Sequence, residues 1–162
     1  MIKVRTMTGA FLFHHEDVLM LKRSINKRMA PGLWACVGGH VEENEYHNPE
    51  ISCFREILEE TGISSGQVEN LKLRYILIRQ KKIEINHHYI FFGESSTRNV
   101  VDCDEGELHW IQFSEIMDLE MPLIFRLMFE HYHVNRNSEH IWTGTLSSSG
   151  HKEEMVWGRL IN

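Results

Sequence analysis

The sequence predicts a mixed α/β (α+β) fold built as a single domain over residues 1–162. Short apolar runs typical of strands recur along the chain, with turn-forming residues between them. Fewer segments carry helical signals, and these follow the first strands and lie near the C-terminus. Many strands combined with two or three helices indicate a mixed sheet with helices packed against it. A chain of this length buries roughly two-thirds of the surface that its unfolded form exposes.

The first elements form a predicted β-hairpin. Residues 3–13 and 18–22 are strand-like, and the polar sequence HHED between them predicts a turn. Residues 23–32 read as a loop because Pro31 and Gly32 interrupt any regular element. Residues 33–37 then predict a third short strand, which ends at a pair of glycines.

The helix predicted at residues 49–62 has clear end signals. Asn48 is suited to cap its N-terminus, and Pro49 is suited to its first position. Gly62 stands where a left-handed residue commonly ends a helix. Spacing at about 100° per residue predicts a buried apolar face and an acidic face opposite it. The predicted buried face consists of Ile51, Cys53, Phe54, Ile57 and Leu58, and the acidic face of Ser52, Glu56, Glu59 and Glu60.

The rest of the chain alternates strand and helix signals. The predicted elements are strands at 68–80, 85–93 and 108–113, a loop at 94–106, a short helical stretch before Pro122, a helix at 123–133, and a terminal β-hairpin around the turn SSSGHK. We expect a core at about residues 3–122 and an extension, helix plus hairpin, at 123–162.

Composition argues against several classes of protein. The net charge is −6 and no dense basic block occurs, which disfavours binding to duplex nucleic acid. Cys36, Cys53 and Cys103 are widely spaced with no CxxC pair, so neither a zinc knuckle nor a disulfide scaffold is predicted. The apolar run near the N-terminus is too short for a signal sequence or a membrane span. We therefore expect a cytoplasmic protein that has no membrane partner.

The acidic face of the 49–62 helix has two interpretations. A solvated surface is the commoner role of such a run. However, glutamates three and four residues apart repel each other by a few tenths of a kcal/mol per pair, and Glu59 and Glu60 also lie near the negative end of the helix dipole. Divalent cations that prefer oxygen ligands would relieve this repulsion. The charge pattern alone leaves both interpretations open.

The wider motif resembles a known family. The sequence GGHVEENE, followed by REILEETGI, is similar to the Nudix box of Nudix hydrolases. The resemblance covers about residues 5–120. It departs from the family pattern in one place, because nine residues rather than seven separate Glu45 from Arg55. The two additional residues fall at Tyr46–Asn48, before the helix begins.

This resemblance implies an α/β/α sandwich around a mixed sheet and a Mg²⁺-dependent hydrolase (Mn²⁺ is possible). The implied reaction cleaves the diphosphate of a nucleoside diphosphate linked to another group. Glu56, Glu59 and Glu60 match the family's metal-binding glutamates, and Glu56 is also a candidate to activate water. Arg55 matches the arginine that orients them. The main-chain carbonyl of Gly39 matches a further metal ligand.

Three residues outside the motif are weaker candidates. Glu105 could supply a further catalytic carboxylate, although most of its acidic loop reads as solvated surface. Arg23 and Arg28 could bind substrate phosphates, and an exposed basic loop is an equally good interpretation of both.

The resemblance leaves the substrate open. A (d)NTP or oxidised (d)NTP, cleaved to a nucleoside monophosphate and pyrophosphate, is our first expectation. The chain is compact and lacks the N-terminal dimerisation region typical of many ADP-ribose members. ADP-ribose or another nucleotide sugar is the alternative, and a catalytically inactive nucleotide sensor is an alternative from another class. A homodimer is possible.

Overall fold

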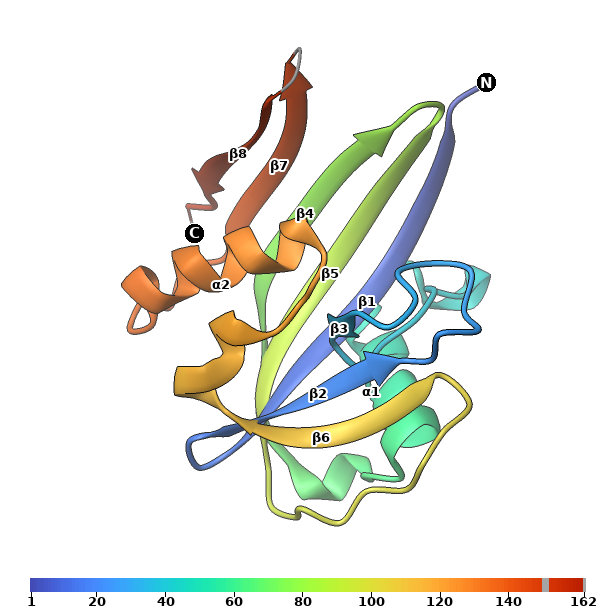
Figure 1. Cartoon of the computed structure of the whole chain (residues 1–162), viewed down its shortest axis with the longest axis vertical. Helices are drawn as coiled ribbons and strands as arrows, with labels where there is room; N and C mark the ends of the chain where they lie inside the picture. Colours follow the sequence, from blue (N-terminus) through green and yellow to red (C-terminus); the bar gives the residue numbers. More distant parts are fainter. Residues whose placement is uncertain (150–151, 162) are drawn as a thin grey trace.

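The computed structural model describes residues 1–149 and 152–161. Its centre is one mixed sheet of eight strands (Figure 1), in the order β3-β2-β1-β5-β4-β7-β8, with β6 paired to β2. The strands are β1 (Lys3–His14), β2 (Asp17–Arg23), β3 (Trp34–Ala35), β4 (Val68–Lys81), β5 (Glu84–Ser95), β6 (Gly106–Gln112), β7 (Trp142–Ser149) and β8 (Lys152–Arg159). The helices are α1 (Pro49–Thr61) and α2 (Leu123–Asn135), with short 3-10 turns at Glu43–Glu45, Ser65–Gln67 and Phe113–Asp118.

Strand pairing brings distant parts of the chain together. β1 and β2 form the predicted antiparallel hairpin, and β1 also runs parallel to β5 over eleven residue pairs, from Lys3 with Glu84 to Phe13 with Glu94. β7 runs parallel to β4 and β8 pairs with β7, so the predicted C-terminal hairpin extends the same sheet. Gly150 and His151, in the turn predicted for that hairpin, lie outside the described residues.

The two helices cover opposite faces of the sheet, which confirms the α/β/α arrangement. Alternate residues of a strand point to opposite faces, so neighbouring residues of β1 contribute to different cores. Ala10 and Leu12 pack with Cys53 and Ile57 of α1. Phe11 packs on the other side, against the aromatic cluster of α2.

The ends of α1 agree with their sequence signals. The side chain of Asn48 accepts a hydrogen bond from the N–H of Glu50 at 3.2 Å. Pro49 begins the helix, and Gly62 adopts φ +76° while its N–H donates to the carbonyl of Leu58. The predicted buried face of α1 is wrong in part, because Ile51 and Leu58 are 48% and 53% exposed.

The helix is rotated relative to the predicted orientation. Ser52 and Glu60 are buried although they lie on the acidic face that was predicted opposite the core. The reason is that segment 37–41 packs beside α1 and covers that side, which periodicity alone does not reveal. Two glutamates of the motif therefore point toward the protein, and the third points outward.

The α2 helix completes the second core. Its buried residues include Phe125, Met128 and Phe129, which pack over β1 and β5. None of the helices in the described ranges has both the length and the apolar character needed to span a membrane.

Candidate active site

Gly38 and Gly39, the two glycines of the motif, lie where the main chain passes between β1 and α1. The N–H of Ala10 donates to Val37, and the N–H of Thr8 donates to the carbonyl of Gly39 at 2.9 Å. Gly38 has φ +152°, and a Cβ there would collide with the backbone of Thr8. A Cβ on Gly39 would collide with the carboxylate of Glu56. Glycine at position 38 therefore lets the main chain approach β1 closely, and glycine at position 39 lets it approach α1.

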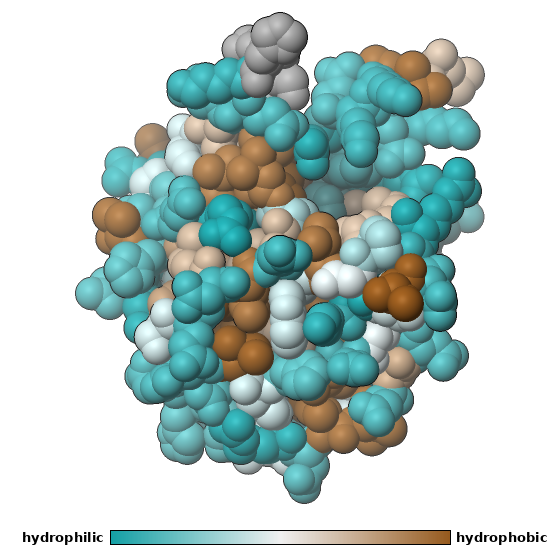
Figure 2. All heavy atoms as spheres, in the orientation of Figure 1, coloured by the Kyte–Doolittle hydropathy of each residue, from teal (hydrophilic) through white to brown (hydrophobic). Residues whose placement is uncertain are grey.

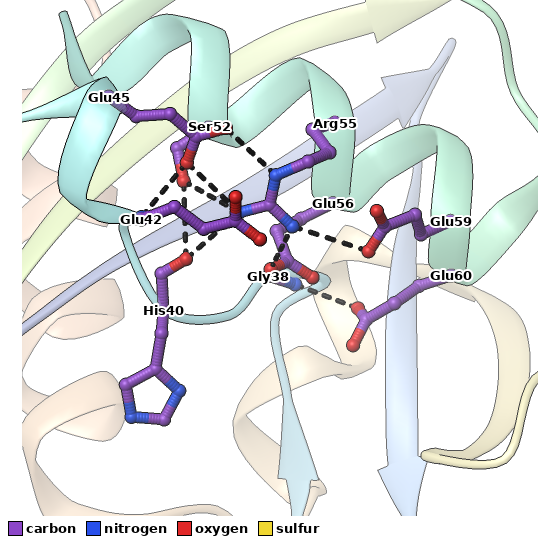
Figure 3. A network of polar contacts seen from close by, with 9 residues as sticks. All are labelled: Gly38, His40, Glu42, Glu45, Ser52, Arg55, Glu56, Glu59 and Glu60. Atoms are coloured by element: carbon purple, nitrogen blue, oxygen red, sulfur yellow. Dashed lines mark hydrogen bonds and ion pairs between the residues drawn. The ribbon is translucent and has the colours of Figure 1, made fainter.

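Arg55 is the centre of the polar network at this face (Figure 3). Its guanidinium donates to Glu45, to Glu56 at 2.8 Å and, over a longer 3.3 Å, to Glu59. Burial opposes the charge of Arg55, but these hydrogen bonds outweigh that effect and raise its pKa. The arginine thus links two of the predicted metal ligands.

Glu45 keeps a defined place despite the longer loop before the helix. It is only 5% exposed, and it receives two hydrogen bonds from Arg55, at 2.8 and 3.0 Å. These bonds lower the pKa of Glu45 to about 2. The additional residues at Tyr46–Asn48 are absorbed in the connection between the 3-10 turn Glu43–Glu45 and α1, where Asn48 still caps the helix.

Glu56 and Glu60 lie on the inward side of α1. Burial raises the pKa of Glu56, although Arg55 lowers it in part. Burial also raises the pKa of Glu60 to about 8, and the negative charges of Glu56 and Glu105 add to this effect. The N–H of Gly38 donates to Glu60 at 2.8 Å and stabilises its charged form in part. Neither carboxylate has enough positive charge nearby to offset the effect of burial on its pKa.

Glu59 differs from these two because its side chain is 58% exposed. In residues 1–149 and 152–161, no three His, Cys, Asp or Glu side chains are arranged to hold a metal ion as they stand. The donors nevertheless suit a hard divalent cation. Carboxylate oxygens are its preferred ligands, and burial raises the pKa values of the buried Glu60 and the partly buried Glu56. A side chain at position 39 would crowd the carboxylate of Glu56.

Glu105 belongs to a second polar group near this face. It forms ion pairs with Lys27 at 2.7 Å and with Arg23 at 3.8 Å. Arg23 also donates to the carbonyl of Met29 at 2.9 Å. The negative charge of Glu105 contributes to the raised pKa of Glu60, which indicates that the two carboxylates face a common region. Arg28 is exposed and forms no ion pair with the described residues.

Two contributors to the site, the carbonyl of His40 and the hydroxyl of Ser52, were not among the predicted site residues. The carbonyl of His40 accepts a hydrogen bond from Arg55 at 3.0 Å, and the hydroxyl of Ser52 accepts a weaker one at 3.3 Å. A main-chain acceptor leaves no signal in side-chain patterns. Ser52 did leave one, because a small polar residue lies one turn before Glu56.

Clustered carboxylates oriented by a guanidinium are typical of enzymes that bind divalent cations for phosphate chemistry. Comparison with known families narrows this class. The model of the NUDIX domain matches residues 3–135, and the protein belongs to that family. It is a Nudix hydrolase and acts on nucleoside diphosphate derivatives. Nudix hydrolases generally use divalent metal ions.

Solved structures share the fold at low sequence identity. A mutator MutT protein from Bacillus halodurans is 22% identical, with a TM-score of 0.71 over 94% of this chain and 97% of that one. A C. elegans Ap4A hydrolase is 15% identical, with a TM-score of 0.68 over 82% and 98%. The NUDIX domain of Shewanella oneidensis NrtR, complexed with ADP ribose, is 15% identical, with a TM-score of 0.62 over 85% and 90%.

Proposed function

We propose that the protein is a Mg²⁺-dependent pyrophosphohydrolase that cleaves a (d)NTP, or an oxidised (d)NTP, to a nucleoside monophosphate and pyrophosphate. The observation that carries this proposal is the pair of inward-facing carboxylates on α1. Glu56 lies beside Gly39 and accepts a hydrogen bond from Arg55, and Glu60 accepts one from the N–H of Gly38. Such a site is suited to an anionic substrate only together with cations, because the protein itself supplies mostly negative charge here.

We assign the metal-binding role to Glu56, Glu59, Glu60 and the carbonyl of Gly39. The carbonyl of Gly39 already accepts the N–H of Thr8, but a carbonyl oxygen has two lone pairs and so retains one for a cation. When bound, Mg²⁺ would neutralise the diphosphate and lower the pKa of a water molecule. Mn²⁺ has the same preference for oxygen ligands and is the alternative.

The side chains of this chain would orient the reactants and move the proton. Arg55 holds Glu56 and Glu59 on one side of the helix through hydrogen bonds of 2.8 and 3.3 Å. Glu56 is our candidate to accept the proton of the attacking water, because its raised pKa makes it a better base than an ordinary glutamate. Water forms a new P–O bond and the bridging P–O bond breaks. The leaving group carries away the bonding electron pair, and it is pyrophosphate or the nucleoside monophosphate according to which phosphorus is attacked.

Two arginines, Arg23 at the end of β2 and Arg28 in the loop that follows it, are proposed to contact the substrate. Arg28 is free to bind a phosphate, whereas Arg23 is partly occupied by Glu105 and Met29. Glu105 itself faces the same region as Glu60 and could act as a further carboxylate of the reaction. Its ion pair with Lys27 would have to loosen for it to do so.

ADP-ribose or another nucleotide sugar is the second candidate substrate. The NUDIX domain of Shewanella NrtR is recorded with ADP ribose, and this chain has the same fold. We prefer the triphosphate because the chain is compact, with one sheet covered by α1 and α2. We propose a nucleotide as the small-molecule partner.

The test is a substrate panel with and without Mg²⁺. The purified chain would be incubated with the four dNTPs, 8-oxo-dGTP, ADP-ribose and Ap4A, and nucleoside monophosphate and pyrophosphate would be quantified separately. We expect Mg²⁺-dependent release of both products from a triphosphate, abolished by EDTA. Release of AMP and ribose 5-phosphate from ADP-ribose alone would favour the second candidate. Tight binding without turnover of any substrate would indicate a nucleotide sensor.

A further inference from the structure

A cavity lies away from the Nudix motif and outside the candidate active site. It encloses about 900 Å³ where the ends of β1 and β5, the beginning of β4 and the C-terminal end of α2 meet. Its aromatic lining residues, Phe13, Phe92 and Tyr132, belong to the core on the α2 side of the sheet. Helix α1 lies on the other side (Figure 1). None of the cavity's lining residues belongs to segment 38–62 or to the group around Glu105. The described function therefore gives this cavity no role.

Strand β4, one of the strands that line the cavity, is irregular in two places. Between Glu69 and Lys72, and again between Leu73 and Tyr75, β4 carries one more residue than its partner β5. Asn70, in the first irregularity, has φ +53°. Arg74 lies in the second. Bulges of this kind redirect side chains and are frequent beside functional sites. Here, Asn70 and Arg74 both line the cavity.

Arg74 has a charge that the described residues do not balance. Its guanidinium carbon lies 5.5 Å from the ring centre of Tyr132 and 5.9 Å from that of Phe92. One terminal nitrogen donates to the carbonyl of Ser138 at 2.7 Å, while the buried Nε has no hydrogen-bond partner. No ion pair within residues 1–149 and 152–161 includes Arg74. A partly buried guanidinium without a carboxylate partner is costly, and a bound anion would offset that cost.

Two further cations lie at the same cavity. Lys72 is exposed and forms no ion pair with the described residues, and Arg136 is 3.7 Å from the largely exposed Glu16. Together with Arg74, they favour a doubly charged anion over a singly charged one. A phosphate monoester carries nearly two negative charges at neutral pH, whereas a carboxylate carries one.

The cavity also contains two carboxylates. Glu69 and Glu94 stand directly opposite each other on β4 and β5. Like charges in that arrangement destabilise a sheet. Both side chains are exposed, and neither forms an ion pair with the described residues. Hydroxyl groups can donate hydrogen bonds to carboxylates. A ligand that suits both the cations and the carboxylates carries a phosphate and hydroxyl groups.

We propose that this cavity binds a small organic phosphate with a polyhydroxylated body, such as a sugar phosphate or the ribose phosphate of a nucleotide. Arg74, whose charge no carboxylate among the described residues balances, is the main phosphate ligand, and Lys72 and Arg136 add charge at the rim. Glu69 and Glu94 receive hydrogen bonds from the hydroxyl groups. The site is independent of the proposed hydrolysis, because it shares no residue with the Nudix motif.

The test observes the Arg74 Nε–Hε signal by NMR in the full chain. EDTA is present throughout, so that metal-dependent binding at the Nudix motif does not contribute. The probes are ribose 5-phosphate, inorganic phosphate and gluconate, which separate the phosphate from the polyol. We expect saturable movement of the Arg74 signal with ribose 5-phosphate, and at least tenfold weaker affinity for the other two. A signal that does not move with ribose 5-phosphate up to about 10 mM, well above a millimolar Kd, would overturn the proposal.

Variants separate the contacts from a structural effect. Since Arg74 also bonds to Ser138, the main variant is Lys72→Gln, which should weaken ribose 5-phosphate about tenfold, the value of one charged contact. Glu69→Gln should weaken ribose 5-phosphate but not inorganic phosphate. The control is Arg79→Gln, since Arg79 pairs with Glu153 outside the cavity. Equal titration of Lys72→Gln and the wild type would contradict the phosphate site, and equal weakening of both ligands by Glu69→Gln would contradict the hydroxyl contacts.

Discussion

The guanidinium of Arg55 donates to both carboxylate oxygens of Glu45, from Nε at 2.8 Å and from a terminal nitrogen at 3.0 Å. This two-bond arrangement ties the loop before α1 to the middle of that helix. It forms although the connection between the two residues is longer than the family pattern. The geometry of the pair, rather than the number of residues between its members, is what the site retains.

The first prediction concerns Arg55→Lys. A lysine cannot make the two parallel bonds or reach Glu56 at the same time. We expect a loss of about 1–3 kcal/mol in the free energy of unfolding, the range for hydrogen bonds to charged groups. Turnover should fall at least tenfold because Glu56 and Glu59 lose a shared donor. Chemical denaturation and steady-state kinetics measure the two effects.

A matched control is Arg98→Lys. Arg98 pairs with Asp17 at 2.6 Å, but its side chain is 47% exposed, and exposed pairs contribute about 0–1 kcal/mol. We expect little change in stability and none in turnover. An equal loss in both variants would show that the arrangement around Arg55 has no special role.

The second prediction is the acid sensitivity that Glu45 confers. Arg55 lowers the pKa of Glu45 from 4.5 to about 2. A lowered carboxyl pKa stabilises the folded state above pH 4.5, and this contribution is lost as the pH falls toward 2. Unfolding measured from pH 7 to pH 2 should show a difference between wild type and Glu45→Gln that shrinks across this window. A difference that is constant with pH would mean that Glu45 acts through packing alone.

Local signals in the sequence predicted the ends of α1 correctly because those ends depend on neighbouring residues. Asn48 and Gly62 act through hydrogen bonds within the helix and its first flanking residues. The orientation of the helix depends instead on segment 37–41, which packs beside it. This is why Leu58 was predicted buried and is exposed, and why Glu60, which was placed on the face opposite the predicted core, is buried.

Contacts between residues that are far apart in the chain could not be predicted from the sequence either. Glu105 was a candidate because its loop is acidic, but its pairing with Lys27, 78 residues away, depends on β2 and β6 lying side by side. The irregularities in β4 at Asn70 and Arg74 gave no signal, because strand periodicity is read over several residues and one additional residue only shifts it.

The third prediction separates metal binding from stability at Glu60. The Glu60→Gln variant keeps an acceptor for the N–H of Gly38 and removes a buried charge. A carboxyl pKa raised to about 8 destabilises the folded state increasingly from pH 4.5 to about 8. We therefore expect the metal-free variant to be more stable than wild type, most clearly above pH 8, while Mg²⁺-dependent turnover falls by about two orders of magnitude, as when a charge-stabilising group is lost.

Glu59→Gln provides the comparison for this result. Its side chain is 58% exposed, so its unfolding free energy should change by less than about 0.5 kcal/mol, as for other surface substitutions. Its turnover should fall as well if it binds metal. Full activity in both variants would show that the assignment of the metal ligands is wrong.

The last prediction concerns the space at Gly39. In Gly39→Ala, the added Cβ would collide with the carboxylate of Glu56, and that carboxylate would have to move. We expect at least a tenfold loss of turnover and a weaker apparent affinity for Mg²⁺, measured by titrating activity with the metal. Gly66→Ala is the control, because nothing lies within 4 Å of a Cβ there, and its activity should match wild type. Unchanged metal affinity in Gly39→Ala would mean that the approach of the main chain to Glu56 does not shape the metal site.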